Sequence, residues 1–411
     1  MYLSPELNVK KLYELYLEKY EKDMFDIYGL KDKKHLFRPK VTYDFYFRYF
    51  KANFNISFGS PRSDTCKTCD EYENKLKLPL PDEELNQIKT SKQLHVSRAQ
   101  VFFDALKEKT EEAKNNPEVE VLCFDHQQNA PLPKVPSGDA FYLRQLWVFN
   151  FCIYSAKTGI SHFYMYDETT GKKTPNETIS FLDHYLKNIM SKDVKTLYIF
   201  SDNCAAQNKN GSLVQYLFTL AQTKQFQSIL HRYPEPGHSF LPCDRSFGVV
   251  EKALRKMERI FTPQEYMTHY GKCSRNFEVV PVEQNMIFDF VNYLKPNFKK
   301  TVINQHRQKF AISKYKLILY EANSGIQCSE SCNVPIYSTF NIQCSTLDTN
   351  TAPNQLYKEK LPLKKVKYDN VMVLANQYVP KNDLSYYEKL TFAQGNTGSD
   401  VEMTNDEETI E

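Results

Sequence analysis

Two aspartates stand at the ends of predicted strands, and a third acid is predicted on a later helix. Asp125 closes an apolar run that begins at residue 119, and Asp202 directly follows a second apolar run. Ligands of open α/β sheets bind beyond the carboxyl ends of the strands, and carboxylates there can hold Mg²⁺ or Mn²⁺. The third acid is Glu251 or Asp244, which lie two helical turns apart on one face. We favour Glu251, because Asp244 could serve only as the helix N-cap.

Divalent ions held by these acids would catalyse the cleavage or transfer of phosphodiester bonds. Two ions about 4 Å apart can activate an attacking oxygen and stabilise the leaving one. The polar stretch after Asp202 could bind backbone phosphates, or could simply be a capped turn; its residues are Asn203, Gln207, Asn208 and Lys209. His238 lies in a Gly-His-Ser sequence, where it could contact phosphate, orient an acid, or fix a loop by a hydrogen bond.

A second candidate site has the spacing of a zinc ligand pair. Cys66 and Cys69 form a Cys-x-x-Cys sequence, which is half of a zinc site, and His95 is a candidate third ligand. The fourth ligand is not identified, and two buried thiols near a helix start are the alternative. With ten cysteines in 411 residues, the chain is too sparse in Cys for a disulfide scaffold. We therefore expect free thiols or a metal site, and the pairs Cys204/Cys243 and Cys328/Cys332 are weaker candidates.

The elements that would position the acids alternate in a recognisable order. Three strands are predicted to form a meander, and strands and helices then alternate in the order β-β-β-α-β-α-β-α. This is the succession of the ribonuclease H fold, an α/β architecture with a mixed sheet. Helix capping signals, with Thr174, Pro175 and Glu177 as the clearest set, support the first helix. The predicted strands cover residues 119–125, 146–154, 161–166, 195–201 and 227–233, and the predicted helices 174–190, 211–224 and 244–260.

Four regions are predicted along the chain. Residues 1–116 form a helical N-terminal region, with helices over residues 2–30, 43–54 and 81–114, and residues 117–262 form the ribonuclease H-like domain. Residues 263–325 hold a helix and a small β-rich appendage, with strands near residues 277–280 and 314–321. Residues 326–411 are predicted to be irregular, ending in a disordered acidic tail from about residue 395.

Composition and charge narrow the class of protein. The 41% apolar and 25% charged fractions are those of a globular chain. No apolar run is long enough for a transmembrane helix, so we expect no membrane partner. The N-terminus lacks the plan of a signal peptide, which indicates an intracellular protein, cytosolic or nuclear.

Charge is spread unevenly along the chain. Residues 251–316 hold 13 Lys and Arg against six Asp and Glu, whereas residues 391–411 hold six acids and no Lys or Arg. The basic stretch could bind nucleic acid or be a solvated helix face. Arg255 and Arg259 are predicted on one helix face, where they could bind phosphate or pair with Glu251 and Glu258. Further candidate phosphate ligands are Lys256, Lys299, Lys300, Arg307 and Lys309.

Several motifs together resemble a known family. They are Phe-Asn-x-x-Phe from Phe54, Asp-x-Cys-x-x-Cys from Asp64, the helix that contains His95, Asp-x-Gln at Asp125, the polar stretch from Asp202, and Gly-His followed by Asp244 and Glu251. This pattern resembles a family of uncharacterised, transposase-like proteins of animal mobile elements, catalogued as a domain of unknown function. The match spans about residues 1–320, and its second and third acidic motifs are the most specific parts.

The resemblance implies a ribonuclease H-like core of the Asp-Asp-Glu type that cuts and joins DNA strands with two Mg²⁺ or Mn²⁺ ions. Asp125, Asp202 and Glu251 would then be metal ligands, with Asp244 in reserve and His238 at the edge of the site. It also implies a nuclear protein that acts on DNA as a homo-oligomer.

The chain departs from the family in places that keep other functions open. Gly248 stands where relatives often have a second His, the sequence begins abruptly, and residues beyond 325 match poorly. A domesticated, inactive DNA-binding or protein-interaction protein is therefore the second hypothesis. A nuclease acting on RNA is the third, because contacts to the 2′-hydroxyl are not legible in the sequence.

Overall fold

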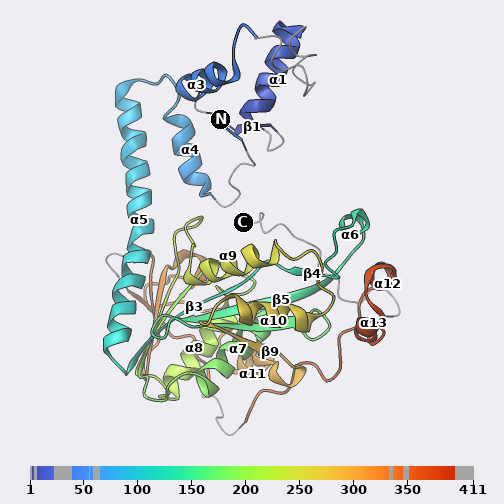
Figure 1. Ribbon diagram of the computed structural model, residues 1–411. Helices are drawn as coiled ribbons and strands as arrows, with labels where there is room; N and C mark the ends of the chain where they lie inside the picture. Colours follow the sequence, from blue (N-terminus) through green and yellow to red (C-terminus); the bar gives the residue numbers. More distant parts are fainter. Residues whose placement is uncertain are drawn as a thin grey trace. The chain divides into compact units, whose positions relative to one another are not determined.

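The computed structural model describes residues 2–3, 7–22, 39–54, 56–58, 65–332, 337–345 and 351–393 (Figure 1). The chain divides into two compact units, Met1–Lys67 and Thr68–Glu411. None of the described helices combines the length and apolar character needed to cross a bilayer.

The first unit is a small helical region with aromatic packing. Its helices are α1 (Val9–Tyr20) and α3 (Tyr43–Asn53), and the short strands β1 (Tyr2–Leu3) and β2 (Ser57–Phe58) pair in parallel. The Tyr13 ring lies 5.4 Å from that of Tyr46, and its hydroxyl donates to the Val41 carbonyl at 2.8 Å. The helical prediction is confirmed for α1 and α3, while its part over residues 23–30 lies outside the described residues.

Two helices precede the sheet. They are α4 (Lys67–Lys75) and α5 (Asp82–Asn115). Three acids in the first turn of α5 favour its N-terminus. The C-terminal half of α5 buries an apolar stripe on the sheet, where the Phe102 ring lies 5.3 Å from that of Phe200. The predicted helix over residues 81–114 is therefore confirmed.

Ten strands of the described residues form one mixed sheet, in the order β12-β11-β10-β8-β7-β3-β5-β6-β9, with β4 paired to β5. β3, β7 and β8 run parallel, whereas β5 is antiparallel to β3 and β6. The strand bounds are β3 (Val119–His126), β4 (Ala130–Leu132), β5 (Leu146–Ser155), β6 (Ser161–Asp167), β7 (Thr196–Ser201), β8 (Ser228–Arg232), β9 (Phe277–Pro281), β10 (Leu317–Glu321), β11 (Ile326–Ser329) and β12 (Ser338–Phe340).

Helices cover both faces of the sheet (Figure 1). On one face, Leu122 and Phe124 of β3 pack with α7 and α8; on the other, Val121 and Cys123 pack with α5, α9 and α10. The alternation of side chains along a strand separates the two sets. The remaining helix bounds are α6 (Gly138–Tyr142), α7 (Pro175–Asn188), α8 (Gly211–Gln222), α9 (Pro242–Leu254), α10 (Pro263–Cys273), α11 (Phe290–Leu294), α12 (Lys365–Tyr378) and α13 (Lys381–Tyr387).

Local signals explain where the central helices begin. The predicted capping box of α7 is present: Asn176 donates its backbone N–H to the Thr174 hydroxyl, and Glu177 accepts from the Thr174 backbone at 3.0 Å. Asn210 caps α8 by accepting from the Leu213 backbone at 3.0 Å. Satisfying these first N–H groups fixes the start of each helix next to the preceding strand.

Two predictions for the later part of the chain are wrong. The strands expected near residues 277–280 and 314–321 exist as β9 and β10, but they extend the central sheet beside β6 and β8 and form no separate appendage. The region after residue 326, predicted to be irregular, supplies β11, β12, α12 and α13. Its apolar pattern is thin because each short element buries only a few residues against distant partners. The predicted disordered acidic tail, from about residue 395, lies outside the described residues.

Candidate functional site: an acidic strand edge and a Cys2His2 group

Asp125 and Asp202 lie side by side where β3 and β7 end. The parallel register pairs Phe124 with Ser201, and the residue that follows each of them is an aspartate. The Asn208 side-chain amide donates to both carboxylates, at 3.2 Å to Asp125 and 2.6 Å to Asp202. Both aspartates are half-buried, so solvent reaches them.

Asp244 is the acid of α9 that acts on this pair. Its negative charge, together with that of Asp202, raises the pKa of Asp125. Asp244 also accepts from the Leu241 backbone at 2.6 Å, which caps the start of α9. Glu251, two turns further along the helix, instead lies 4.0 Å from Arg255, and its charge acts on Tyr270. Asp244, rather than Glu251, is therefore the α9 acid whose charge acts on Asp125.

The acidic edge carries negative charge that a cation would stabilise. Burial is the largest cause that holds the pKa of Asp125 well above its ordinary value, followed by the charges of Asp202 and Asp244. Hydrogen bonds from the His126 backbone, at 2.7 Å, and from Asn208 act in the opposite direction. Carboxylates gathered in this way are the hard oxygen ligands that Mg²⁺ and Mn²⁺ prefer.

The residues of the polar stretch after Asp202 mostly form hydrogen bonds within the protein. Asn208 is fully buried between the two carboxylates. Asn203 donates to the Pro234 carbonyl at 2.9 Å and accepts from the Lys209 ammonium at 2.9 Å. Burial, and next the charge of Lys316, lowers the pKa of Lys209 to about 8. Gln207 is half-buried, and its backbone carbonyl accepts from the Asn210 amide at 3.0 Å.

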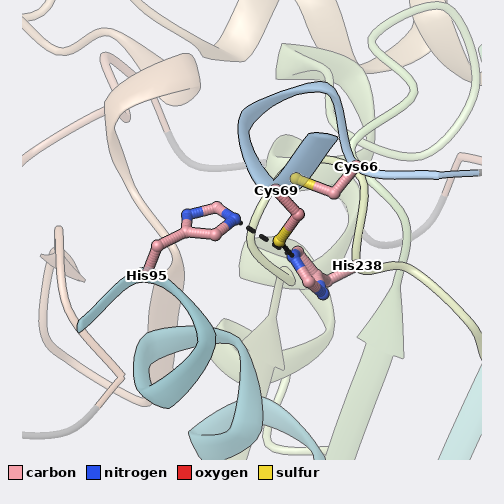
Figure 2. A group of neighbouring side chains, drawn as sticks. All are labelled: Cys66, Cys69, His95 and His238. Atoms are coloured by element: carbon pink, nitrogen blue, oxygen red, sulfur yellow. Dashed lines mark hydrogen bonds between the residues drawn. The ribbon is translucent and has the colours of Figure 1, made fainter. Parts of the chain in front are cut away.

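Four side chains form a Cys2His2 group that could hold a metal ion: Cys66, Cys69, His95 and His238 (Figure 2). Their ligand atoms all lie within 4.8 Å of one another. The Nε2 atom of His238 lies 3.4 Å from the Cys69 sulfur and 3.1 Å from Nε2 of His95. Neighbouring ligands of a tetrahedral zinc ion stand roughly 3.5 Å apart, given metal–ligand distances of about 2.0–2.3 Å.

Separate elements bring these ligands together. Cys66 directly precedes α4, Cys69 lies in its first turn, His95 lies on α5, and His238 lies in the loop between β8 and α9. Burial is the largest cause that lowers the pKa of His238, and the neighbouring His95 lowers it further. The neutral imidazole is the form that binds a metal.

Sequence reasoning found three of the four ligands and gave His238 another role. The sequence predicts this histidine at the edge of the acidic site and identifies no fourth zinc ligand. The only local signal was its position after Gly237 in a Pro-rich loop. Within the described ranges this is the one group of three or more such side chains whose ligand atoms come this close, so the three carboxylates stand further apart.

The other cysteines are free thiols. Cys243 is buried under the sheet, where its thiol donates to the Cys123 carbonyl at 3.3 Å. Cys328 is buried in β11, and burial also raises the pKa of Cys332. Raised thiol pKa values keep these groups protonated and unreactive.

Lys209 is buried, but the other basic residues predicted to bind phosphate are exposed, although not all are arranged as expected. α9 ends at Leu254 and not near residue 260, so Arg255 and Arg259 do not share a helix face. Arg255 lies 4.0 Å from Glu251, as the alternative interpretation of this pair predicted. Lys299 and Lys300 are exposed, and Lys299 donates to the Asn341 carbonyl at 3.1 Å.

Residues 152–323 match a domain of unknown function, DUF7869. The match includes Asp202, His238, Asp244 and Glu251, whereas Asp125 and the other three residues of the Cys2His2 group precede it. No curated protein matches the chain. The description of the matched domain assigns no activity, so the function must be argued from the two sites.

Proposed function

We propose that this protein is a transposase-derived polynucleotidyl transferase or nuclease that acts on DNA with two Mg²⁺ or Mn²⁺ ions. The supporting observation is the juxtaposition of Asp125 and Asp202 at adjacent parallel strand ends, with the charge of Asp244 on α9 acting on Asp125. The strand order β6-β5-β3-β7-β8, with antiparallel pairing up to β3 and parallel pairing beyond it, supports the proposal of a ribonuclease H-like core.

Each of the three acids would have a defined role in such a site. Asp125 and Asp202 would hold the ions, with Asp244 as the third ligand in place of Glu251. When bound, the ions would activate the attacking oxygen and stabilise the leaving oxygen of a phosphodiester. Asn208 holds the two strand-end carboxylates in one orientation before any ion arrives, which lowers the cost of assembling the site.

We further propose that the Cys2His2 group holds one structural Zn²⁺. Two thiolates and two imidazoles whose ligand atoms lie within 4.8 Å of one another would leave a tetrahedral ion no open coordination position, which is the character of a structural and not a catalytic zinc site. The group therefore supplies stability and position, and the acids supply the chemistry.

The proposed substrate and cellular location rest on the exposed basic residues and on the resemblance to transposase-like proteins. DNA is the proposed substrate, with exposed Lys299 and Lys300 among its phosphate contacts. Such contacts make affinity strongly dependent on salt and nearly independent of base sequence. A nuclear location and assembly into homo-oligomers on DNA belong to the same proposal.

One observation favours a second candidate function, a domesticated DNA-binding or protein-interaction protein without catalysis. Asp125 and Asp202 already share the Asn208 amide, and Asp244 already caps α9. All three acids therefore have structural roles, which they would keep in a protein that binds no divalent ion.

A plasmid-nicking assay tests the choice between these functions. Wild-type protein with Mn²⁺ should relax supercoiled DNA, and Asp202→Asn should abolish this activity while leaving DNA affinity unchanged. Glu283→Gln, a substitution of an exposed acid in the same match to DUF7869, is the matched control. Wild-type protein that binds DNA but never nicks it would favour the domesticated function.

A further inference from the structure

Helix α6 carries two aromatic residues that the fold leaves in solvent. Phe141 is 85% exposed and Tyr142 is 84% exposed, more than any other large apolar residue in the described parts of the chain. Their rings pack edge to face, with centroids 5.2 Å apart and planes at 88°. Because the stabilisation from an aromatic ring depends on its burial, these two rings add little to folding. Their exposure therefore points to a binding role.

The segment that carries the two rings is held in place from both sides. At its base, the Gln145 side chain donates to the Pro133 carbonyl at 2.7 Å. Before the rings, the Tyr378 hydroxyl of α12 accepts from the Ser137 hydroxyl at 2.7 Å and donates to the Asp139 carboxylate at 2.7 Å. Phe141 and Tyr142 are thus presented on a support that is fixed to α12.

The position of α6 is at the end of the sheet where Asp125 lies. β5 runs antiparallel to β3, with Asp125 opposite Cys152, and begins at Leu146, six residues before Cys152. At about 3.3 Å per residue, the start of β5 lies roughly 20 Å beyond Asp125. α6 leads into that start and projects from the sheet beside β4 (Figure 1). At about 3.4 Å per base-pair step, this distance is roughly six steps of duplex DNA.

Positive charge lies at the base of the same segment. The backbones of Lys134 and Ile260 exchange two hydrogen bonds, at 2.8 and 3.0 Å, so the stretch after α9 reaches the start of the α6 segment. Residues 252–259 hold four cations against one acid. All four cations are exposed: Lys252, Arg255, Lys256 and Arg259. This charge favours a polyanion over an apolar protein surface as the occupant of the exposed rings.

We infer that Phe141 and Tyr142 form a stacking site for unpaired bases of DNA, with the cations of residues 252–259 binding the neighbouring phosphates. The inference rests on the proposed function and deepens it, because it names DNA with a single-stranded segment as the substrate. An exposed aromatic ring stacks on any base, since every base has a π-face, and cations beside it follow the backbone. The site therefore recognises unpaired bases without reading their sequence.

Photochemical cross-linking on the full chain tests where unpaired bases lie. The probe is a DNA duplex with a single-stranded 3′ overhang that carries 5-iodouracil, which cross-links to aromatic side chains stacked on it. Divalent ions are left out, so the DNA is not cut. We expect the cross-link in the tryptic peptide Val135–Arg144, which contains both rings. Cross-links that form only in other peptides would overturn the inference.

Fluorescence anisotropy with the same DNA measures the contribution of the rings. Phe141→Ala/Tyr142→Ala should weaken affinity for the overhang by at least about fivefold, the lower end for losing one stacked base, and leave affinity for blunt duplex nearly unchanged. Phe141→Tyr/Tyr142→Phe keeps both rings and should bind as wild type does. Tyr20→Ala, which removes an exposed aromatic residue beside Lys19, is the matched control and should also bind as wild type does.

The outcomes separate this inference from the proposed function. Unchanged overhang affinity in the double alanine variant would overturn the stacking site and leave the proposed function intact. A cross-link at the two rings in a protein that never nicks DNA would support the stacking site and count against catalysis. Loss of self-association in sedimentation, with DNA affinity unchanged, would assign the rings to a second copy of the chain and overturn the inference. Because both rings are exposed, each variant should keep the wild-type melting temperature.

Discussion

The Nε2 atoms of His95 and His238 lie 3.1 Å apart, although 143 residues separate them in the chain. Two imidazolium rings would repel each other at this distance, so at least one ring is neutral. Burial and the neighbouring His95 lower the pKa of His238, which agrees with that state. The Cys69 sulfur lies 3.4 Å from the same nitrogen of His238. The three side chains are therefore placed so that they can bind one cation together.

The first prediction is that the protein as isolated contains one Zn²⁺ per chain. Cys69→Ser and His95→Ala should each reduce bound zinc by at least tenfold, and chelation should lower the melting temperature, because a structural ion contributes directly to folding. Elemental analysis by plasma mass spectrometry, paired with calorimetric melting, measures both.

Matched controls for zinc are available in the same chain. Cys344→Ser and His306→Ala change exposed residues of the same types outside the Cys2His2 group, and should leave both the zinc content and the melting temperature unchanged. Metal-free wild-type protein with an undiminished melting temperature would contradict the prediction.

The second prediction concerns the third acid. Asp244→Asn should weaken Mn²⁺ binding by about tenfold or more, because its charge reaches the Asp125 carboxylate. Glu251→Gln should leave the affinity within about twofold, because Glu251 faces Arg255 and Tyr270. Isothermal titration calorimetry with Mn²⁺ compares the two variants. The reverse order of effects would restore Glu251 as the ligand.

The third prediction is that Asn208 stabilises the fold most when no divalent ion is present. Asn208→Ala removes the donor shared by Asp125 and Asp202, so the metal-free protein should lose about 1–3 kcal/mol of unfolding free energy. Saturating Mn²⁺ should recover part of this loss, since the ion neutralises the same carboxylates. Urea unfolding with and without Mn²⁺ measures it, with the neighbouring Gln207→Ala as control. An equal loss of unfolding free energy with and without Mn²⁺ would show that Asn208 does not act on the proposed metal site.

The fourth prediction concerns a buried ion pair that anchors α12. The Lys367 ammonium lies 2.6 and 2.8 Å from the two carboxylate oxygens of Glu168, and both residues are almost fully buried. Lys367→Met should cost about 3–5 kcal/mol of stability, because Glu168 stays buried without its cation. The double variant Glu168→Gln/Lys367→Met should recover most of the loss. Chemical unfolding at pH 7.5 compares them, and an additive double variant would contradict the pairing.

The same pair predicts a dependence on pH. Burial, only partly offset by Lys367, raises the pKa of Glu168 to about 7 from its ordinary 4.5. A carboxyl whose pKa is higher in the folded state binds its proton more tightly there. Its contribution to stability is therefore full below pH 4.5 and is lost as the pH rises through about 7. Lys367→Met, which removes the lowering influence, should steepen this loss in unfolding experiments between pH 5 and pH 8, roughly the window in question.

The order of the central elements could be predicted from the sequence because each carries its own signal. The apolar runs of β3, β5 and β7 are long and continuous, as buried strands are, and Thr174 and Glu177 mark the start of α7 locally. The adjacency of Asp125 and Asp202 follows from the parallel pairing that the strand–helix–strand alternation implies.

What the sequence could not give depends on contacts between distant residues. His238 has no spacing that links it to Cys69, since a metal group assembled from a helix and a remote loop leaves no local motif. One helical face contains both Asp244 and Glu251, so the choice between them depends on which end of α9 approaches the strand ends, and the sequence does not show this. The short strands β11 and β12 carry little signal of their own and are defined by their pairing, β11 with β10 and β12 with β11.

The central claim is that Asp125 and Asp202 form a divalent-metal site, and calorimetric titration of Mn²⁺ into zinc-loaded protein tests it most directly. We predict saturable binding by the wild type that Asp202→Asn abolishes, with the melting temperature of the variant kept within a few degrees by the isosteric change. A wild type that binds no Mn²⁺ and no Mg²⁺, even with DNA present, would contradict the account. The domesticated, non-catalytic function would then be the better explanation of this fold.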